Sequence, residues 1–536
     1  MLSLPALPRS LGPVVKPPQY LVAAFIVSIG GLLNGLDTGV IGPVTTMPTF
    51  ADYFGHLSAS QHGIVVSSLL LSATIASLFA GSLSDTLGRP RAIAIGSLVF
   101  AVGAALEAAA TDLAMFVVGR LIVGIGEALF LSTLMVYVCE ISPPKHRGPL
   151  ASIVQSLITL GLMLGYFMCF ATIHIQSSFS WRFPLALQSG IAVFLALASF
   201  QLPQSPRWLT YKGRHAEAAA AWDVLGVSGA EREKDSLLVR APVNQGGPAR
   251  RMPETVSFRQ RWLRNLNRLI GVFGKESRTQ MWLACFMMSM QQLSGIDGVL
   301  YYAPLLFQQA GLSTSKASFL ASGVSAILIF VTTIPAVLLS DRVGRRASTI
   351  YGGFILSASM ALIGSLYASE SVHESYGAGR WVVVVMIYLF TVCYCMTWAV
   401  GVKVFASEIQ PVATRATATS LAQSANCITN FFVAFITPVL LSKSSFGIYF
   451  LFCGASAITV GVCAIFMPET RGQSLETITE SFHQHLAMDA ALVRVPRKLV
   501  GQVRSAIVRK NTRRAQVNIV VENRTGIELG AISVST

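Results

Sequence analysis

Five ionisable residues lie inside stretches of sequence that are otherwise apolar. They are Asp37, Arg120, Glu127, Asp297 and Lys403. Burying an ionised side chain within a membrane costs at least about 2.5–3.5 kcal/mol, so such residues usually serve a proton, an ion or a polar ligand. Their chemistry is therefore expected to be ion pairing, proton exchange or ligand binding.

Two acids within the apolar stretches, Glu127 and Glu107, need separate interpretations. Glu127 follows Arg120 by seven residues, which puts both side chains on the same face of a helix. It is either a second titrating group or a hydrogen-bonded structural acid. Glu107 lies near the end of an apolar run, where we expect it to reach water by snorkelling.

The reactive side chains predict no enzyme chemistry. The eight cysteines lie in apolar stretches without CxxC or Cys/His ligand spacing, so we interpret them as small buried hydrophobic residues. A nucleotide-binding P-loop and a nucleophile constellation are also missing from the sequence. We predict no catalytic residue, no metal and no cofactor.

Composition indicates the elements that must position the buried charges. Of the 536 residues, 53% are hydrophobic and 12% are charged, and the mean hydropathy is +0.60. These values exclude an ordinary soluble protein and a disordered chain. A bilayer core of about 30 Å needs roughly 20 apolar residues per helix. Twelve such runs are predicted at 20–43, 63–83, 92–111, 113–138, 149–174, 184–202, 281–308, 317–340, 347–368, 381–406, 416–440 and 446–467.

The net charge of +15 reports membrane topology rather than nucleic-acid binding. If the loops alternate sides, 34 of the 40 Lys and Arg residues fall on the side of both termini and 4 on the other. Basic loops remain cytoplasmic in membrane proteins, so both termini are predicted to be cytoplasmic.

The longest polar interruption separates the predicted spans into two groups of six. The predicted parts are a cytoplasmic N-tail (1–19), a first six-helix bundle (20–202), a central cytoplasmic loop (203–279), a second six-helix bundle (280–467) and a cytoplasmic C-tail (468–536). The central loop is expected to carry short amphipathic helices, one of them at 257–273.

The two halves share an internal repeat, as in transporters built by duplication. LSDTLGRPR matches LSDRVGRRA, VYVCEISPPKHRG matches VFASEIQPVATRA, and LPQSPR matches MPETRG. Taken singly, these segments are turns and positive-inside anchors; as a duplicated set, they predict latches that hold the two bundles together on the cytoplasmic side. The paired gating residues are Asp85 and Asp341, Arg89 and Arg345, Glu140 and Glu408, and Arg147 and Arg415.

The ordered motifs GRLIVGIG, EISPPKHRG, LPQSPRWL, QQLSGIDGVLYYAP, DRVGRR and MPETRGQSLE resemble the sugar porter family of the major facilitator superfamily over about residues 20–480. The resemblance implies twelve transmembrane helices in two six-helix bundles. It also implies alternating access, with a monosaccharide-like substrate held between the bundles.

The resemblance further implies roles for individual residues. Asp37 matches the aspartate of proton-coupled members, and Arg120 matches its partner; the alternative is a permanent buried ion pair. An arginine beside a carboxylate lowers the proton affinity of the carboxylate, so moving the arginine would couple protonation to bundle motion. Amides both donate and accept hydrogen bonds, as sugar hydroxyls do. The matching substrate-binding residues are Gln155, Gln291, Gln292 and Asn426, and Tyr301 and Tyr302 match the outer gate.

Departures from the family pattern point to an unusual substrate. Asp297 replaces an asparagine, Cys427 a tryptophan, Asn34 an aromatic residue and Gln204 a glutamate. Lys403 stands where the family has a tryptophan that stacks on the sugar. Lys403 is open to three interpretations: it binds a substrate carboxylate, pairs with Asp297, or snorkels toward the cytoplasm.

The predicted function is a proton symporter for a monosaccharide or sugar acid, such as a hexose, pentose, uronate or quinate-like compound. The alternatives are a proton-independent facilitator of sugars or polyols, a transporter-like nutrient sensor, and a metabolite efflux carrier. The protein is expected to be a monomer in the lipid bilayer of the plasma membrane and to bind no nucleic acid.

Overall fold

The computed structural model describes residues 18–143, 146–227, 278–312, 315–339, 344–372, 377–410 and 415–469. These residues form helices, and no strand occurs among them. All of them belong to one compact unit, Met1–Leu475. The prediction of an all-α fold is confirmed for the described residues, whereas 1–17 and 470–536 of the predicted tails and the amphipathic segment 257–273 lie outside them.

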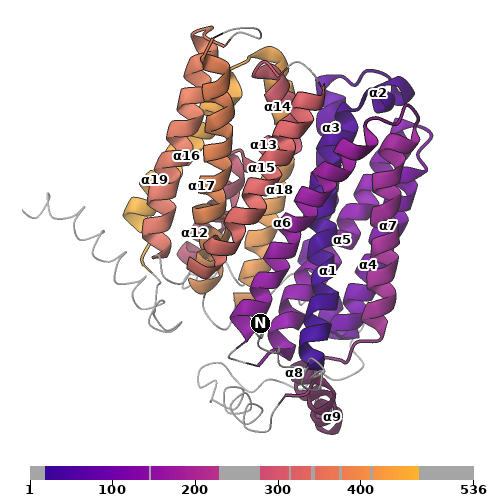
Figure 1. Cartoon of the computed structure of the whole chain (residues 1–536). Helices are drawn as coiled ribbons and strands as arrows, with labels where there is room; N and C mark the ends of the chain where they lie inside the picture. The colour runs from indigo at the N-terminus through magenta and orange to yellow at the C-terminus, as the bar shows by residue number, and fades with distance from the viewer. Residues whose placement is uncertain are drawn as a thin grey trace, which may run out of the picture. The chain divides into compact units, whose positions relative to one another are not determined.

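The first half of the chain forms six long helices that run side by side (Figure 1). They are α1 (Gln19–Thr46), α3 (Ala59–Leu87), α4 (Arg89–Ala108), α5 (Leu113–Ile141), α6 (Arg147–Thr172) and α7 (Phe179–Phe200), with the short α2 (Pro48–Phe54) after α1. Packing pairs α4 with α5 and α7, α1 with α6, and α3 with α5. Two further short helices, α8 (Pro206–Tyr211) and α9 (His215–Leu225), follow this bundle.

The second half repeats the arrangement with one broken helix. Its elements are α12 (Arg278–Leu293), α13 (Ile296–Tyr301), α14 (Ala303–Gln309), α15 (Ser315–Leu339), α16 (Arg345–Ala368), α17 (Gly379–Glu408), α18 (Arg415–Lys443) and α19 (Gly447–Phe466). Here α16 packs on α17 and α19, and α12 packs on α18. Among the described residues, 11 helices are long and apolar enough to cross a membrane.

The predicted span 281–308 was wrong as a single helix, because α12, α13 and α14 divide it. Gly295 adopts a left-handed conformation with φ 92°, which ends α12 and starts α13. Pro304 lies in the first turn of α14 and has no N–H to donate to the carbonyl of Leu300. That carbonyl instead accepts a hydrogen bond from the hydroxyl of Tyr166 on α6. The break in the helix therefore creates a contact between the two bundles.

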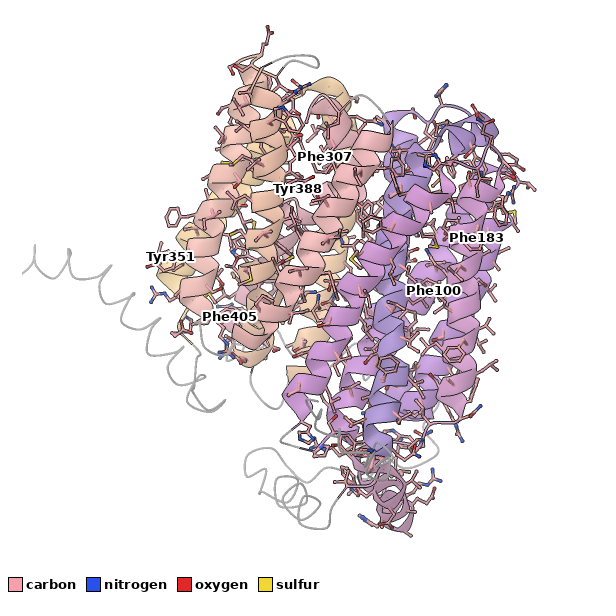
Figure 2. The ribbon with its side chains drawn as sticks, viewed as in Figure 1. Phe100, Phe183, Phe307, Tyr351, Tyr388 and Phe405 are labelled. Atoms are coloured by element: carbon pink, nitrogen blue, oxygen red, sulfur yellow. The ribbon has the colours of Figure 1, made fainter. Side chains whose placement is uncertain are left out.

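The lipid-facing and core surfaces of the helices differ in their aromatic residues. Phe100, Phe307 and Phe405 are fully buried, whereas Tyr351 on α16 is 71% exposed and projects away from the helices (Figure 2). Long helices with apolar residues both inside and outside are expected where the surrounding solvent is lipid. The burial pattern therefore fits a protein whose outer surface faces a bilayer.

Glycines permit close packing of α1 against α6. A Cβ added to Gly35 would lie 1.8 Å from the carbonyl oxygen of Ile158, and one added to Gly161 would lie 2.2 Å from that of Leu32. Small residues at such positions let two membrane helices approach closely. This packing positions α1, which carries Asp37, within the first bundle.

We expect Gly35→Ala to destabilise the purified protein by at least about 1–3 kcal/mol, because overpacking forces the two helix backbones apart. Thermal unfolding of detergent-purified protein, followed by size-exclusion chromatography, measures the loss. Gly190→Ala on α7 is the matched control, since no atom lies within 4 Å of the added Cβ. Equal melting temperatures for the two variants would contradict this account of the packing.

Candidate functional site

A buried ion pair joins α1 to α5 near the middle of the first bundle. Asp37 and Arg120 are 3% and 1% exposed, and Arg120 Nη1 lies 2.7 Å from Asp37 Oδ1. Arg120 Nη2 also donates to the carbonyl oxygen of Val66 on α3, at 3.4 Å. The structure therefore brings together the two residues that the sequence resemblance pairs, and it does so out of contact with lipid.

The prediction that Glu107 snorkels to water was wrong. Its side chain is fully buried, and its Oε1 lies 3.9 Å from Arg120 Nη1. Neither of its carboxylate oxygens has a hydrogen-bond partner among the described residues. A Cβ on Gly119 would lie 2.7 Å from Glu107 Cγ, so the carboxylate-bearing chain lies directly against the backbone of α5. The position of Glu107 near the end of α4 suggested that its side chain would reach water, but the packing of α4 on α5 buries it.

Glu127 accepts a hydrogen bond from Asn34 on α1. The distance from Asn34 Nδ2 to Glu127 Oε1 is 2.5 Å, and Glu127 is 8% exposed. Glu127 is also within electrostatic range of Asp37 and Arg120. Asn34 stands at a position where the resembled family often has an aromatic residue, and the structure supplies a reason: the amide is the partner of the extra acid on α5.

The amides predicted to bind substrate form a connected network in the second bundle. Gln292 Nε2 donates to Asn426 Oδ1 at 3.1 Å, and Asn426 Nδ2 donates to the carbonyl oxygen of Met288 at 2.8 Å. Gln291 Nε2 donates to the carbonyl oxygen of Trp398 at 2.8 Å. Gln292 Oε1 is buried without a partner among the described residues. These hydrogen bonds hold the amides of Gln291, Gln292 and Asn426 in fixed orientations. The fourth predicted amide, Gln155 on α6 of the first bundle, is partly buried.

Asp297 and Lys403 are near each other but make no direct contact that the structure records. Asn430 Nδ2 donates to Asp297 Oδ2 at 2.5 Å, so the carboxylate already has an amide partner. Lys403 lies within electrostatic range of Asp297 and Cys427, and its side chain is exposed. These two neighbours belong to α13 and α18, which pack against α1 and α3 of the first bundle, so Lys403 lies near the interface between the bundles.

Electrostatic interactions across the bundle interface connect the two sets of charges. Tyr301 is within range of Asp297 in its own bundle and of Asp37, Arg120 and Glu127 in the other. The thiol of Cys427 is likewise within range of Glu127, Asp297 and Lys403. Asp37, Arg120 and Glu127 of the first bundle therefore lie within electrostatic range of residues of the second bundle at the interface between them.

The bundles approach closely at the end of the helices opposite to α8 and α9. A Cβ on Gly42 of α1 would lie 2.0 Å from the carbonyl oxygen of Tyr301. The hydroxyl of Tyr302 donates to the carbonyl oxygen of Ala434 at 2.7 Å, and the ring of His62 on α3 packs edge-on against Tyr302 at 5.1 Å. The predicted gate tyrosines thus lie in contacts that bring α1 and α3 against the second bundle.

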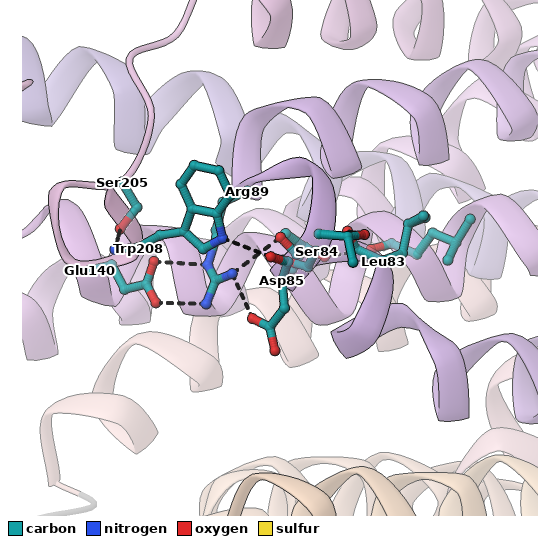
Figure 3. Close-up of polar contacts among 10 residues, drawn as sticks. Leu83, Ser84, Asp85, Arg89, Glu140, Ser205 and Trp208 are labelled. Atoms are coloured by element: carbon teal, nitrogen blue, oxygen red, sulfur yellow. Dashed lines mark hydrogen bonds and ion pairs between the residues drawn. The ribbon is translucent and has the colours of Figure 1, made fainter. Parts of the chain in front are cut away.

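The predicted latches form ion pairs within each bundle. Arg89 contacts Glu140 through two hydrogen bonds of 3.0 and 3.1 Å, and it contacts Asp85 at 2.7 Å (Figure 3). In the second half, Arg345 Nη2 lies 3.4 Å from Glu408 Oε1. The predicted ion pairs between helix ends are therefore confirmed for Arg89 and Arg345, each of which contacts an acid on a neighbouring helix of its own repeat. That the set holds the two bundles together stays a prediction. Asp341 and the side chains of Arg147 and Arg415 lie outside the described residues.

The matched motifs LPQSPR and MPETRG make corresponding contacts in the two halves of the chain. Glu469 accepts hydrogen bonds from the backbone N–H groups of Arg345 and Arg346, at the start of α16. A carboxylate there stabilises the helix N-terminus. Gln204 occupies the corresponding place beside Gly88 in the first half. Gly88 has φ 89°, which fits the predicted tight turn, whereas Gly344 has an ordinary φ of −59°.

Sequence reasoning missed Tyr166 and Asn430, and it misplaced Glu107. Pro304 was the available signal for Tyr166, because a proline inside a membrane span frees a carbonyl that needs a new donor. No sequence signal identifies Asn430 as the partner of Asp297, since the two are brought together only by the packing of α13 on α18.

The prediction that the cysteines are buried is confirmed for Cys169, Cys393, Cys395 and Cys463, whereas the other four are partly buried. Among the described residues, no His/Cys/Asp/Glu cluster suits a metal.

Comparison with known proteins gives consistent similarities. The family profile described as "Sugar (and other) transporter" matches residues 23–482. The glucose transporter GlcP of Staphylococcus epidermidis is 31% identical over 87% of this chain and 97% of its own length. The arabinose-proton symporter of Escherichia coli is 29% identical over 88% of this chain and 94% of its own. The structure of the proton:xylose symporter XylE bound to 6-bromo-6-deoxy-D-glucose aligns with a TM-score of 0.68 and 22% identity, covering 86% of this chain and 99% of XylE.

Proposed function

The chain belongs to the sugar (and other) transporter family, and from this premise we propose that it is a proton symporter for a monosaccharide or sugar acid. It is a multi-pass integral membrane protein of the major facilitator fold, and it is not an enzyme. The family assignment covers sugar transport as a class. The coupling ion and the substrate are proposed from the site.

The buried pair of Asp37 and Arg120 is the observation that carries proton coupling. Two ionised groups held 2.7 Å apart in a membrane bundle are costly to desolvate and are rarely retained without a function. A proton on Asp37 would cancel the attraction that holds α1 to α5 at this point. A change in that attraction is a direct way for proton binding to bias the packing of the first bundle. The similarity to an arabinose-proton symporter supports the same assignment.

The environment of Lys403 supports an acidic substrate. Lys403 is an exposed residue on α17, which packs on the helices α12 and α18 that carry the amides, so the carboxylate and hydroxyl groups of one ligand would be bound together. Asp297 accepts a hydrogen bond from Asn430 and forms no ion pair with Lys403 within the described part of the chain, so a substrate carboxylate would be a direct partner for the ammonium. A uronate or a quinate-like polyhydroxy acid has the required combination of one carboxylate and several hydroxyls.

The alternatives make different demands on the same residues. A facilitator that ignores protons would not need the ion pair, and a nutrient sensor or efflux carrier would not need uptake against a gradient. We further propose a monomer in the plasma membrane, with both termini cytoplasmic, no nucleic-acid partner and no cofactor beyond the proton. The distribution of Lys and Arg supports this orientation.

Uptake by yeast cells that lack their own transporters tests the function. Labelled hexoses, pentoses, galacturonate and quinate would be supplied at acidic pH, with and without a protonophore. We expect accumulation that the protonophore abolishes, with an acidic compound among the substrates. Uptake of glucose alone would contradict the acidic substrate, and accumulation insensitive to the protonophore would contradict proton coupling.

A further inference from the structure

The guanidinium of Arg120 lies between two buried carboxylates from different helices. Asp37 on α1 is 2.7 Å from Nη1, and Glu107 on α4 is 3.9 Å from the same atom. Arg120 Nε and both oxygens of Glu107 have no hydrogen-bond partner among the described residues. An acceptor and a donor that are both buried and unsatisfied in adjacent positions are normally costly. They can pair with each other after a small movement of the arginine.

Glycines hold Glu107 at this distance. A Cβ on Gly103 of α4 would lie 2.6 Å from the backbone nitrogen of Val123, and one on Gly119 would lie 2.7 Å from Glu107 Cγ. These two glycines let α4 and α5 approach closely enough for the acid to reach past the α5 backbone. The position of Glu107 is therefore built by the packing of the two helices and is not an accident of its own rotamer.

The charges around Arg120 are unequal in number. No second cation interacts with Arg120 among the described residues, and the carbonyl oxygen of Val66 on α3 is a neutral acceptor for its Nη2. The titratable groups within its electrostatic range are Asp37 from α1, Glu107 from α4, Glu127 from α5 itself and Tyr301 from α13. One guanidinium carries a single positive charge, which offsets only one of the two carboxylates, and its Nη1 lies at contact distance from Asp37 alone, so Asp37 and Glu107 compete for it.

This competition has a consequence for proton binding. When a proton binds Asp37, one O–H bond forms and the ion pair with Arg120 loses its negative charge. Without a second acid, that step would leave a buried cation unpaired, which costs several kcal/mol. With Glu107 ionised beside it, the arginine keeps a partner, and the group of three changes from a net charge of about −1 to about zero.

We propose that Glu107 is the second partner of Arg120, and that the guanidinium moves from Asp37 to Glu107 when Asp37 takes up a proton. Glu107 is a positioning residue in this scheme, because it acts on the proton site through Arg120 and contacts no substrate. The inference rests on the proposed proton symport. It adds a specific acid on α4 to the machinery that links α1 and α5.

The test uses the full-length chain in proteoliposomes. Uptake is measured from external pH 5 to 8 with the labelled compound that the wild type accumulates most among hexoses, pentoses, galacturonate and quinate. Glu107→Gln is expected to keep substrate counterflow near the wild-type rate, because exchange needs no net proton movement. Half-maximal uptake by this variant should require a proton concentration at least about tenfold higher. Without the Glu107 charge, Arg120 stays beside Asp37, and an opposite charge at this range disfavours protonation of a carboxylate by about one to three pH units. Glu107→Asp should fall between the two.

Glu217→Gln on α9 is the matched control, because Glu217 is an exposed acid paired with Arg214 outside the bundles. Its pH profile should equal that of the wild type. Where Glu107→Gln gives no folded protein, Glu107→Asp carries the test with a smaller shift in the same direction. An unshifted profile in a folded Glu107 variant, with proton-driven wild-type uptake, overturns this inference alone. Wild-type uptake that ignores the proton gradient overturns the proposed symport as well.

Discussion

Replacing Asp37 by asparagine is expected to abolish proton-driven accumulation and to leave counterflow largely intact. Asparagine keeps the size of the side chain and still accepts a hydrogen bond from Arg120, but it cannot bind and release a proton. In proteoliposomes with an inward proton gradient, the ratio of internal to external substrate should fall to about one, because only facilitated exchange remains. Counterflow of labelled substrate measures the exchange in the same preparation.

The controls for Asp37→Asn separate coupling from structure. Arg120 would remain buried without a full negative partner, so its interaction with Glu107 at 3.9 Å becomes the remaining charge compensation. Thermal unfolding of the purified variant shows whether this is sufficient to keep the fold. Asp52→Asn on α2, outside the ion-pair cluster, provides a matched acid-to-amide control. Equal loss of accumulation and counterflow in a folded Asp37→Asn variant would indicate a structural ion pair instead of a coupling site.

Replacing Lys403 by glutamine is expected to raise the KM for an acidic substrate about 10- to 100-fold, with little change for neutral sugars. A hydrogen bond to a charged group contributes about 1.5–3 kcal/mol, and each 1.4 kcal/mol is tenfold in affinity. Uptake of galacturonate, quinate and a neutral hexose would be compared in the same cells. Lys403→Trp, which restores the aromatic residue of the resembled family, should favour the hexose further.

The control for the Lys403 experiment is Lys443→Gln, since Lys443 is an exposed cation in the last turn of α18. Its substrate profile should match the wild type. The double variant Lys403→Gln with Asp297→Asn addresses the remaining alternative, an internal pair. If removing both charges restores uptake that removing one destroys, Lys403 serves Asp297. If the acidic substrate is lost in both variants, Lys403 binds the substrate.

The positions of the helices followed from composition and periodicity because a membrane imposes a length on every apolar segment. Eleven of the twelve predicted spans correspond to long helices among the described residues. The exception, 281–308, contains Gly295 and Pro304, whose backbone preferences divide it into α12, α13 and α14. Both residues were visible in the sequence. Their effect depends on Tyr166 of the other bundle, which supplies the donor that the broken helix lacks.

The sequence by itself determined that the chain is a membrane protein and that it is divided into two repeats. It also identified five ionisable residues inside the spans, among them Asp37, Arg120 and Lys403. Those properties follow from local hydrophobicity and charge, which each segment carries independently of its neighbours. Only the tertiary structure decided that Asn34 binds Glu127, that Asn430 binds Asp297, and that Glu107 is buried beside Arg120. These partners come from different helices, so their distances depend on glycine-mediated packing and on crossing geometry that no single segment encodes.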